Sequence, residues 1–147
     1  MTRPITVLYA EDEENDVFFL QRAFKLAGSP HILRAVPDGA EALEYLAGDG
    51  IFADRTQHPF PHLILLDINL PKKSGLDVLE WIRSQPRSKS LPTLILTSSS
   101  RHEDMEKARQ LGADDYLLKP FDPLDLVDLV RSLQERWLSQ PAIASEV

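Results

Sequence analysis

The chain has 147 residues, of which 43% are hydrophobic and 27% are charged, and this length and composition favour one globular domain over a disordered or fibrous chain. A formal net charge of −7 argues against nucleic acid as a partner, because a nucleic-acid-binding surface needs clustered Lys and Arg. The absence of cysteine excludes disulfides and thiolate metal sites, and no apolar run is long enough to cross a bilayer. We therefore expect a cytoplasmic protein with no membrane contact.

Short apolar runs alternate with helix-length amphipathic segments along the chain. Turn residues bound the runs, as they bound the buried strands of a parallel sheet. The pattern predicts strands over 5–10, 32–36, 63–66, 93–97 and 116–119, and helices over 14–27, 40–47, 75–84, 102–111 and 123 to about 138. Right-handed crossovers give an α/β fold with helices on both faces of the sheet. We expect one domain over 1–147, with its core over about 4–138.

Capping and stop residues mark the ends of these helices. Gly28 and Gly112 stop the first and fourth helices, and Asp38, Ser74 and Asp122 cap the second, third and fifth. The loop over 48–62 is longer than most, and such loops are often functional or mobile. The tail over 139–147 lacks periodicity, so we predict that it is mobile.

Acidic residues stand where two apolar runs stop. Glu11 and Asp12 follow the first predicted strand, Asp67 follows the third, and Lys119 closes the fifth. Each acid alone could start a loop or cap a helix, but the carboxyl ends of parallel strands share one edge of the sheet, where open α/β sheets bind ligands. Oxygen ligands suit Mg²⁺ and an ammonium suits a phosphoryl oxygen. The set together therefore predicts a site for Mg²⁺ and a phosphoryl group.

Four motifs in order, covering nearly the whole chain, resemble the receiver domain of two-component response regulators. They are Glu-Asp at 11–12, Leu-Leu-Asp-Ile-Asn-Leu-Pro at 65–71 with Gly75 following, Leu-Thr-Ser at 96–98, and Tyr-Leu-Leu-Lys-Pro-Phe at 116–121. The resemblance implies a flavodoxin-like fold, a three-layer sandwich whose five parallel strands have the order 2-1-3-4-5. In that order the two acidic clusters become neighbours.

The resemblance also implies a role for each site residue. Asp67 is similar to the phosphoacceptor, and the metal set is Asp12 as a direct Mg²⁺ ligand, Glu11 through water, Asp67 itself and Asn69 through its backbone carbonyl. Thr97 and Lys119 resemble the pair that holds the phosphoryl group, and Thr97 and Tyr116 the switch. Glu11 departs from the Asp-Asp form of the motif, although Glu-Asp also occurs in the family. The Lys119–Pro120 bond becomes a candidate for the cis form.

The same chemistry follows from the residues. An aspartate is a competent nucleophile toward phosphorus when Mg²⁺ screens the negative charge on both partners. Lys119 can neutralise one phosphoryl oxygen, and the Thr97 hydroxyl with the Ser98 backbone can bind another, so no base is required. Simpler interpretations stay open: Lys119 as a strand-end lysine in water, Thr97 as the end of a strand, and Tyr116 as ordinary core.

These observations predict a stand-alone switch, not an enzyme, that accepts a phosphoryl group on Asp67 from a sensor histidine kinase and signals to an unknown downstream protein. The long loop before the third strand and the extension over 135–138 resemble those of single-domain regulators paired with bacterial and cyanobacterial phytochrome kinases. One alternative is a Mg²⁺-dependent phosphatase of the haloacid-dehalogenase type, although Asn69 stands where that class has its second aspartate. Another is a pseudo-receiver that only binds partners.

The last predicted helix is apolar over more than one stripe. A single stripe suffices to cover one face of a sheet, so part of this set should be exposed in a monomer: Leu124, Leu126, Val127, Leu129, Val130, Leu133, Trp137 and Leu138. We expect a homodimer through the fourth helix, fifth strand and fifth helix, disrupted by a charge at Val130 or Leu133. The alternative is that the wider face is wholly intramolecular.

Overall fold

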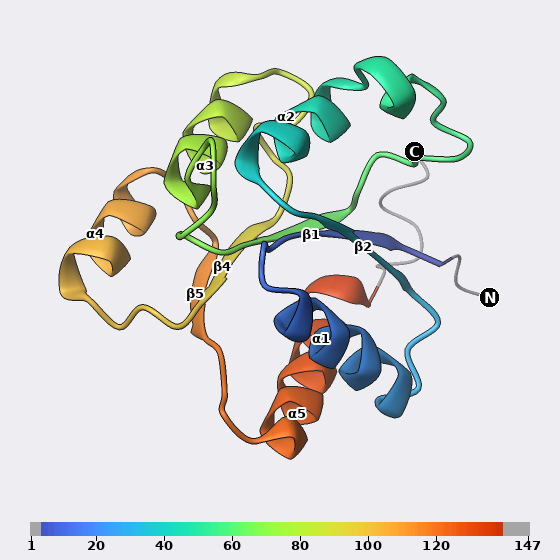
Figure 1. Cartoon of the computed structure of the whole chain (residues 1–147), viewed down its shortest axis with the longest axis vertical. Coiled ribbons are helices and arrows are strands. Elements are labelled where there is room, and N and C mark those ends of the chain that lie inside the picture. Colours follow the sequence, from blue (N-terminus) through green and yellow to red (C-terminus); the bar gives the residue numbers. More distant parts are fainter. Residues whose placement is uncertain (1–3, 140–147) are drawn as a thin grey trace.

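A single parallel sheet organises the protein in its computed structural model, which describes residues 4–139. The strand order is β2-β1-β3-β4-β5, so the predicted topology is confirmed (Figure 1). The strands are β1 (Thr6–Ala10), β2 (Ile32–Val36), β3 (Leu63–Leu66), β4 (Thr93–Thr97) and β5 (Asp115–Leu118).

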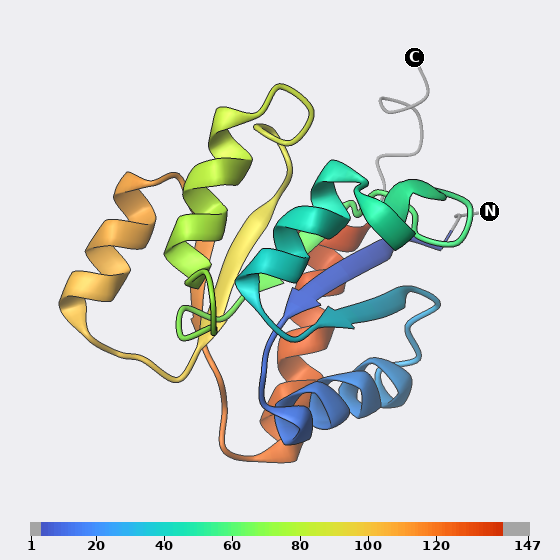
Figure 2. The same ribbon diagram turned by 45° about the horizontal axis from the view of Figure 1, so that its top comes forward.

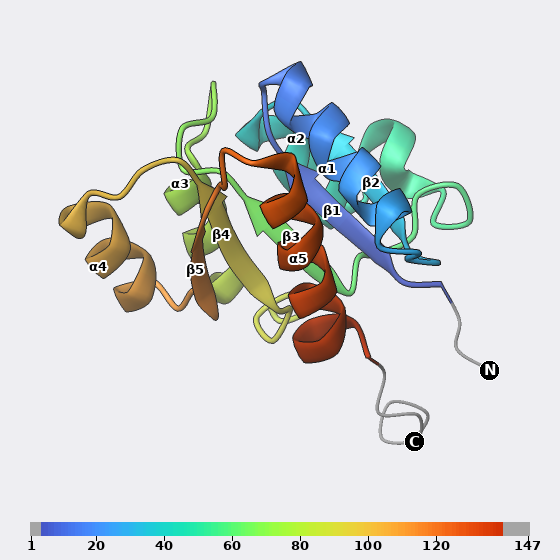
Figure 3. The same ribbon diagram turned by 90° about the horizontal axis from the view of Figure 1, so that it is seen from below.

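Helices cover both faces of this sheet. Figures 2 and 3 show α1 and α5 on one face, with α2, α3 and α4 on the other. The helices are α1 (Glu14–Leu26), α2 (Gly39–Ala47), α3 (Gly75–Ser84), α4 (His102–Gln110) and α5 (Pro123–Leu133), with a 3₁₀ turn η1 (Gly50–Ala53) and a π-helical turn η2 (Gln134–Leu138). Over residues 4–139, none of these helices has the length and apolar character that a membrane crossing requires.

The core lies in two layers because side chains alternate across each strand. In β1, Leu8 and Ala10 pack toward α2 and α3, whereas Val7 and Tyr9 pack toward α1 and α5. The central strands β1, β3 and β4 are fully buried, while the edge strand β5 is only partly covered. A strand that is buried on both faces has a continuous apolar sequence, and this pattern predicts β3.

The predicted helix caps are confirmed. Asp38 accepts a hydrogen bond from the Glu41 backbone N–H at 2.7 Å, and Asp122 accepts one from Leu124 at 2.9 Å. Ser74 forms a reciprocal capping box with Asp77 at the start of α3. These caps fix where α2, α3 and α5 begin, and thus where the loops at the carboxyl edge of the sheet end.

The first strand, the fifth strand and the first, second and fourth helices each differ by one residue from the predicted bounds, and the last helix changes type before its predicted end. The fifth strand covers Asp115–Leu118 and not 116–119, because Asp115 pairs with Leu94 and Lys119 already leaves the strand. The last regular α-helix ends at Leu133, and the chain continues to Leu138 as the π-helical turn η2. Of the predicted mobile tail, residues 140–147 lie outside the described part of the chain.

The long loop over 48–62 packs against the end of α2. Arg55 donates hydrogen bonds to the backbone carbonyls of Tyr45 at 2.8 Å, Leu46 at 3.0 Å and His58 at 3.2 Å. These include carbonyls that the last turn of a helix leaves unpaired. The Tyr45 hydroxyl donates to the Pro59 carbonyl at 2.8 Å. The loop is therefore held by specific contacts on the α2 face, away from the acidic residues.

The apolar set of the last helix is mostly covered within the monomer. Val127, Val130, Leu133 and Leu138 are buried, and only Leu124 is largely exposed, at 71%. The wide apolar face thus packs on the sheet and on α1, as the intramolecular alternative supposed. A charge at Val130 or Leu133 would disrupt the core, so the predicted test of a dimer at those positions was wrong.

Candidate functional site

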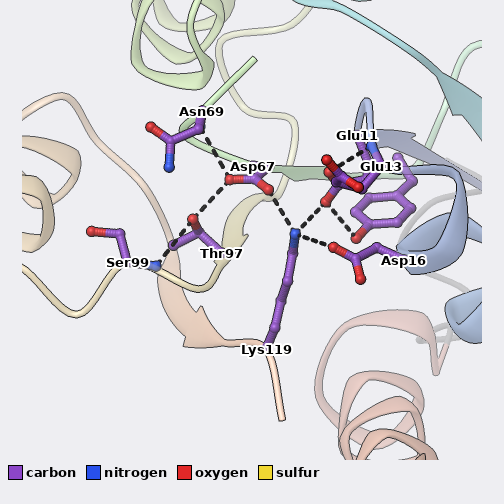
Figure 4. Close-up of polar contacts among 9 residues, drawn as sticks. Glu11, Glu13, Asp16, Asp67, Asn69, Thr97, Ser99 and Lys119 are labelled. Carbon is purple, nitrogen blue, oxygen red and sulfur yellow. Dashed lines mark hydrogen bonds and ion pairs between the residues drawn. The ribbon is translucent and has the colours of Figure 1, made fainter. Parts of the chain in front are cut away.

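Three of the four predicted strand-end residues, Glu11, Asp67 and Lys119, meet at the carboxyl edge of the sheet. β1 and β3 are adjacent, with Ala10 opposite Leu66, so the next residue of each strand, Glu11 and Asp67, comes to the same place. Lys119 reaches them from the end of β5. Figure 4 shows its ammonium between Glu11, Asp67 and Asp16.

The Asp67 carboxylate is buried and held by three donors. Its Oδ1 accepts hydrogen bonds from the Thr97 hydroxyl at 2.7 Å and the Asn69 backbone N–H at 3.1 Å, and its Oδ2 accepts one from the Lys119 ammonium at 2.7 Å. Burial alone would raise the pKa of Asp67, but the bonds from Lys119 and Thr97 outweigh it and hold the pKa below its usual value. These contacts therefore favour the ionised form of Asp67, which is the form that can act as a nucleophile.

Gly75 lets α3 start directly against the backbone of Asp67. A Cβ at this position would lie 2.1 Å from the Asp67 carbonyl oxygen. Because this oxygen belongs to the backbone, no side-chain movement could relieve the clash. The Gly75 N–H donates to the Ile68 carbonyl at 3.0 Å and closes the turn after β3. The glycine of the sequence motif is thus explained by this close approach, which fixes the backbone that carries Asp67.

Lys119 uses all three of its donors on carboxylates. Its ammonium bonds to Asp67 and Asp16, each at 2.7 Å, and to Glu11. Burial would lower the pKa of Lys119, but the bonds to Asp16, Asp67 and Glu11 raise it above its usual value. The interpretation of Lys119 as a solvated strand-end lysine was wrong. The Lys119–Pro120 bond is trans, as are all peptide bonds over residues 4–139, so the suggested cis form was wrong too.

Glu11 is buried beside Asp67. Its Oε1 accepts hydrogen bonds from the Tyr9 hydroxyl at 3.1 Å and from Lys119, and its Oε2 accepts one from the Glu13 backbone N–H at 3.1 Å. Burial raises the pKa of Glu11 to about 7, with the Lys119 bond opposing this shift and the negative charge of Asp67 adding to it. The site therefore lacks enough positive charge and hydrogen-bond donors to stabilise the ionised form of Glu11 fully.

Negative charge exceeds positive charge in this cluster. The Glu11, Asp16 and Asp67 carboxylates share one ammonium, and Asp12 adds an exposed carboxylate with no hydrogen-bond partner among the described residues. This donor set fits a hard divalent cation, because Mg²⁺ prefers carboxylate oxygens and keeps several of its waters. Over residues 4–139, no three His, Cys, Asp or Glu side chains converge closely enough to hold a metal ion by themselves.

Thr97 connects Asp67 to the predicted switch residue. The Ser99 backbone N–H donates to the Thr97 hydroxyl oxygen at 3.4 Å, and the Tyr116 hydroxyl donates to the Ser99 carbonyl at 2.8 Å. Tyr116 is half-buried at the margin of the core. Its hydroxyl is thus tied to the loop that follows Thr97, whereas ordinary core packing would need only the ring.

Two residues of this cluster were missed by the sequence reasoning, Tyr9 and Asp16. Tyr9 lies two residues before Glu11, on the same side of the strand, and it is the one aromatic residue in the run 5–10. That alternation is a signal that could have found it. Asp16 lies in the first turn of α1, where acids are common for helix-dipole reasons, so its type and position carried no distinguishing signal.

Comparison with known proteins finds one matching family model and several similar proteins. A family model described as the response regulator receiver domain matches residues 7–131. Response regulator Rcp1 of Synechocystis sp. is 34% identical over 135 residues, which cover 92% of this chain and 90% of that protein. The Mn²⁺-bound crystal structure of Rcp1 has a TM-score of 0.82 at 34% identity and covers 93% of this chain and 96% of that chain.

Two further solved structures are similar. The phosphorylated cyanobacterial phytochrome response regulator RcpA has a TM-score of 0.86 and 34% identity, covering 93% of this chain and 96% of that one. RPA3017, described as a response regulator in red light signaling of R. palustris, has a TM-score of 0.87 and 35% identity, covering 93% and 95%. The relatives therefore agree in fold and span nearly the same length.

Proposed function

Because the chain belongs to the response regulator receiver domain family, we propose that it is a phosphorylation switch whose Asp67 accepts a phosphoryl group from a sensor histidine kinase in a Mg²⁺-dependent reaction. One observation carries the proposal: the Thr97 hydroxyl and the Lys119 ammonium both lie at hydrogen-bond distance from the Asp67 carboxylate, and these bonds hold its pKa below the usual value. A nucleophile and two donors for phosphoryl oxygens thus stand together.

The proposed reaction needs no base. An Asp67 carboxylate oxygen forms a bond to phosphorus while the bond from phosphorus to the donor breaks, which is a phosphorus–nitrogen bond when the donor is phosphohistidine. The departing imidazole nitrogen keeps the electron pair. Lys119 neutralises charge on one transferred oxygen and the Thr97 hydroxyl donates to another, which stabilises the transition state.

Mg²⁺ would supply positive charge to balance the excess negative charge of the acidic cluster. Receiver domains in general bind Mg²⁺, and the related Rcp1 has a Mn²⁺-bound structure. In this chain we assign Asp12 and Asp67 as carboxylate ligands, Glu11 as a ligand through water and Asn69 through its backbone carbonyl. Glu11 and Asp67 are already adjacent, and exposed Asp12 can approach from the loop after β1.

The direct test replaces the acceptor. Asp67→Asn keeps the size of the side chain but removes the nucleophilic charge, so labelling by acetyl phosphate with Mg²⁺ should be abolished. Asp128→Asn, at an exposed carboxylate of α5, is the matched control and should be labelled like the wild type. Acid-labile label retained on Asp67→Asn would overturn the assignment.

The phosphatase alternative is disfavoured. Receiver domains are generally not catalytic enzymes, and Asn69 donates its backbone N–H to Asp67 where the haloacid-dehalogenase class would have an acid. An amide side chain cannot protonate a leaving group. Multiple turnover of a generic phosphate ester by the wild type, lost in Asp67→Asn, would favour the phosphatase over the switch.

We propose α4, β5 and α5 as the output and dimer face. A groove of about 380 Å³ between α4 and β5 is lined by residues that include Met105 and Tyr116. Each of the three elements also has an exposed apolar side chain, namely Met105 on α4, Leu118 on β5 and Leu124 on α5. Phosphorylation would draw the Thr97 hydroxyl onto the phosphoryl group, and the loop bonded to Tyr116 would follow. The same face would then change shape.

A homodimer through this face can be tested at an exposed residue. Leu118→Glu should shift light scattering toward the monomer in the presence of beryllofluoride, because a charge would enter the interface. Ile51→Glu, at a more exposed apolar side chain on η1, should leave the dimer unchanged. A monomer in every condition would reject this interface.

A phytochrome-type histidine kinase is the proposed partner. The support is the likeness to RcpA and RPA3017, whose descriptions name a phytochrome and red light signaling. Phosphotransfer from a purified phytochrome kinase should label the wild type faster than transfer from a kinase of another class. Equal rates would leave the receiver assignment intact and remove this partner.

A further inference from the structure

Tyr9 brings a hydroxyl to the acidic cluster from inside the core. Its ring is buried, at 1% exposure, in the layer under α1 and α5. Its hydroxyl donates to Glu11 Oε1 at 3.1 Å. Tyr9 also lines a small cavity of about 30 Å³ with Asp16 and Lys119, so it lies directly beneath the cluster.

The Glu11 carboxylate needs more contacts to fix its orientation than an aspartate carboxylate would need. Its side chain has one more methylene and one more rotatable bond than aspartate, so its carboxylate can occupy more positions. The Glu13 backbone N–H fixes Oε2, whereas Oε1 is held by Tyr9 and by Lys119.

Tyr9 is the contact that stays when the site reacts. Lys119 is shared among Glu11, Asp16 and Asp67, and the proposed reaction draws it toward a phosphoryl oxygen. After that movement, the Tyr9 hydroxyl is the remaining side-chain donor on Glu11 Oε1 among the contacts of the described residues. The hydroxyl belongs to a ring that is packed in the core and cannot follow Lys119.

We propose that Tyr9 is a positioning residue for the divalent cation, and that its hydroxyl fixes the Glu11 carboxylate in the orientation that binds Mg²⁺. This inference rests on the proposed function, since it assigns a part of the same site. Partners that orient metal ligands in this way alter metal affinity when they are removed, typically by 10- to 100-fold. Because Glu11 is assigned to act through water, we expect an effect near the lower limit.

A purely structural role makes a different prediction. In that case the hydroxyl of Tyr9 only satisfies its own burial, and its removal changes stability but not metal binding. Tyr45 supplies the matched comparison, because it is also 1% exposed and its hydroxyl also donates one hydrogen bond, to the Pro59 carbonyl on the α2 face. Tyr45→Phe is therefore the same chemical change at a site remote from the acids.

The experiment titrates Mg²⁺ into the full chain by calorimetry at fixed pH. Tyr9→Phe should weaken Mg²⁺ binding by about tenfold, whereas Tyr45→Phe should bind like the wild type. In labelling by acetyl phosphate, Tyr9→Phe should need more Mg²⁺ for half-maximal rate but reach the wild-type rate at saturation. Wild-type Mg²⁺ affinity in Tyr9→Phe would overturn the inference.

A double-mutant cycle isolates the contact. Glu11→Asp shortens the side chain by one methylene and takes the carboxylate out of reach of the Tyr9 hydroxyl, so adding Tyr9→Phe should then cost no further affinity. A full tenfold loss in the Glu11→Asp background would also overturn the inference. A wild type that does not bind Mg²⁺ would contradict the proposed function itself, whereas a wild type that binds while Tyr9→Phe binds equally contradicts only the role of Tyr9.

Discussion

Two cationic side chains, Arg83 and Lys119, lie at the centres of hydrogen-bonded clusters at opposite ends of the sheet. The two clusters differ in the number of carboxylates that each cation contacts. At the amino ends of β4 and β5, Arg83 bonds to the carbonyls of Lys89, Leu91 and Gly112, and to the Asp114 carboxylate at 2.9 Å. One guanidinium thus meets one carboxylate and otherwise neutral acceptors. At the carboxyl ends, Lys119 meets three carboxylates.

The difference distinguishes a structural cluster from the cluster for which we propose phosphoryl transfer. The Arg83 cluster is neutral in sum and joins the end of α3 to the segments that enter β4 and β5, since Asp114 also accepts from the Thr93 N–H at 2.8 Å. The Lys119 cluster carries excess negative charge that folding alone does not neutralise. Charge left uncompensated in a folded protein marks a place where a ligand is expected to bind.

The largest expected effect is on phosphorylation. Lys119→Ala removes the donor that neutralises a transferred oxygen, and the rate of labelling by acetyl phosphate should fall by about 10²- to 10³-fold. Lys72→Ala, at an exposed lysine that pairs loosely with Asp38, is the control and should retain the wild-type rate. An unchanged rate in Lys119→Ala would contradict the proposal that the Lys119 cluster, unlike the Arg83 cluster, takes part in phosphorylation.

The next effect is on stability. Arg83→Ala removes the guanidinium donor shared by three backbone carbonyls and leaves the Asp114 carboxylate with only the Thr93 N–H, so the free energy of unfolding should fall by about 2–3 kcal/mol. Arg131→Ala, in an exposed pair with Asp128, should cost less than about 0.5 kcal/mol. Denaturation with urea measures both. A strong Mg²⁺ dependence of the Arg83→Ala loss would contradict the view that this cluster is structural.

A smaller effect concerns pH in the absence of divalent cations. The pKa of Glu11 is raised by burial to about 7 in the folded protein, so the folded state holds a proton that the unfolded chain has released. This contribution to stability is complete below the usual glutamate pKa of about 4.3 and is lost as pH rises through about 7. We therefore expect the free energy of unfolding to decrease over that window.

Glu11→Gln is the control for this pH effect and should abolish the loss. The lowered pKa of His31, caused first by burial and then by His62, acts in the opposite direction but is common to both proteins. The lowered pKa of Asp67 acts only at more acidic pH, below its usual value. Identical pH profiles for the wild type and Glu11→Gln would show that Glu11 is already compensated.

The sequence predicted that three strand-end side chains meet because their positions follow from the topology of the sheet. Glu11, Asp67 and Lys119 each follow a buried strand, and the carboxyl ends of parallel strands share an edge whatever the side chains do in detail. The caps at Asp38 and Ser74 were predictable for a similar reason, since capping depends on local backbone geometry. The strand order came from the family resemblance.

What the sequence did not predict depends on side-chain conformation across elements. Asp16 bonds to Lys119 although they are 103 positions apart, and no local pattern distinguishes it from an ordinary first-turn acid. The packing of Arg55 on the end of α2 is likewise a tertiary contact. The boundary of β5 moved by one residue because the pairing of Asp115 with Leu94 overrides the apolar run from Tyr116.

The charge deficit at the carboxyl edge can be measured directly as stabilisation by Mg²⁺. At pH 8, the free energy of unfolding of the wild type should rise with Mg²⁺ concentration in the manner of a ligand that binds only the folded state, by about 2.7 kcal/mol at one hundred times the dissociation constant. Asp67→Asn, which removes one of the assigned ligands, should show a much smaller rise. A wild-type stability that does not respond to Mg²⁺, or that responds equally in Asp67→Asn, would contradict the assignment of this acidic edge as the site of Mg²⁺-dependent phosphoryl transfer.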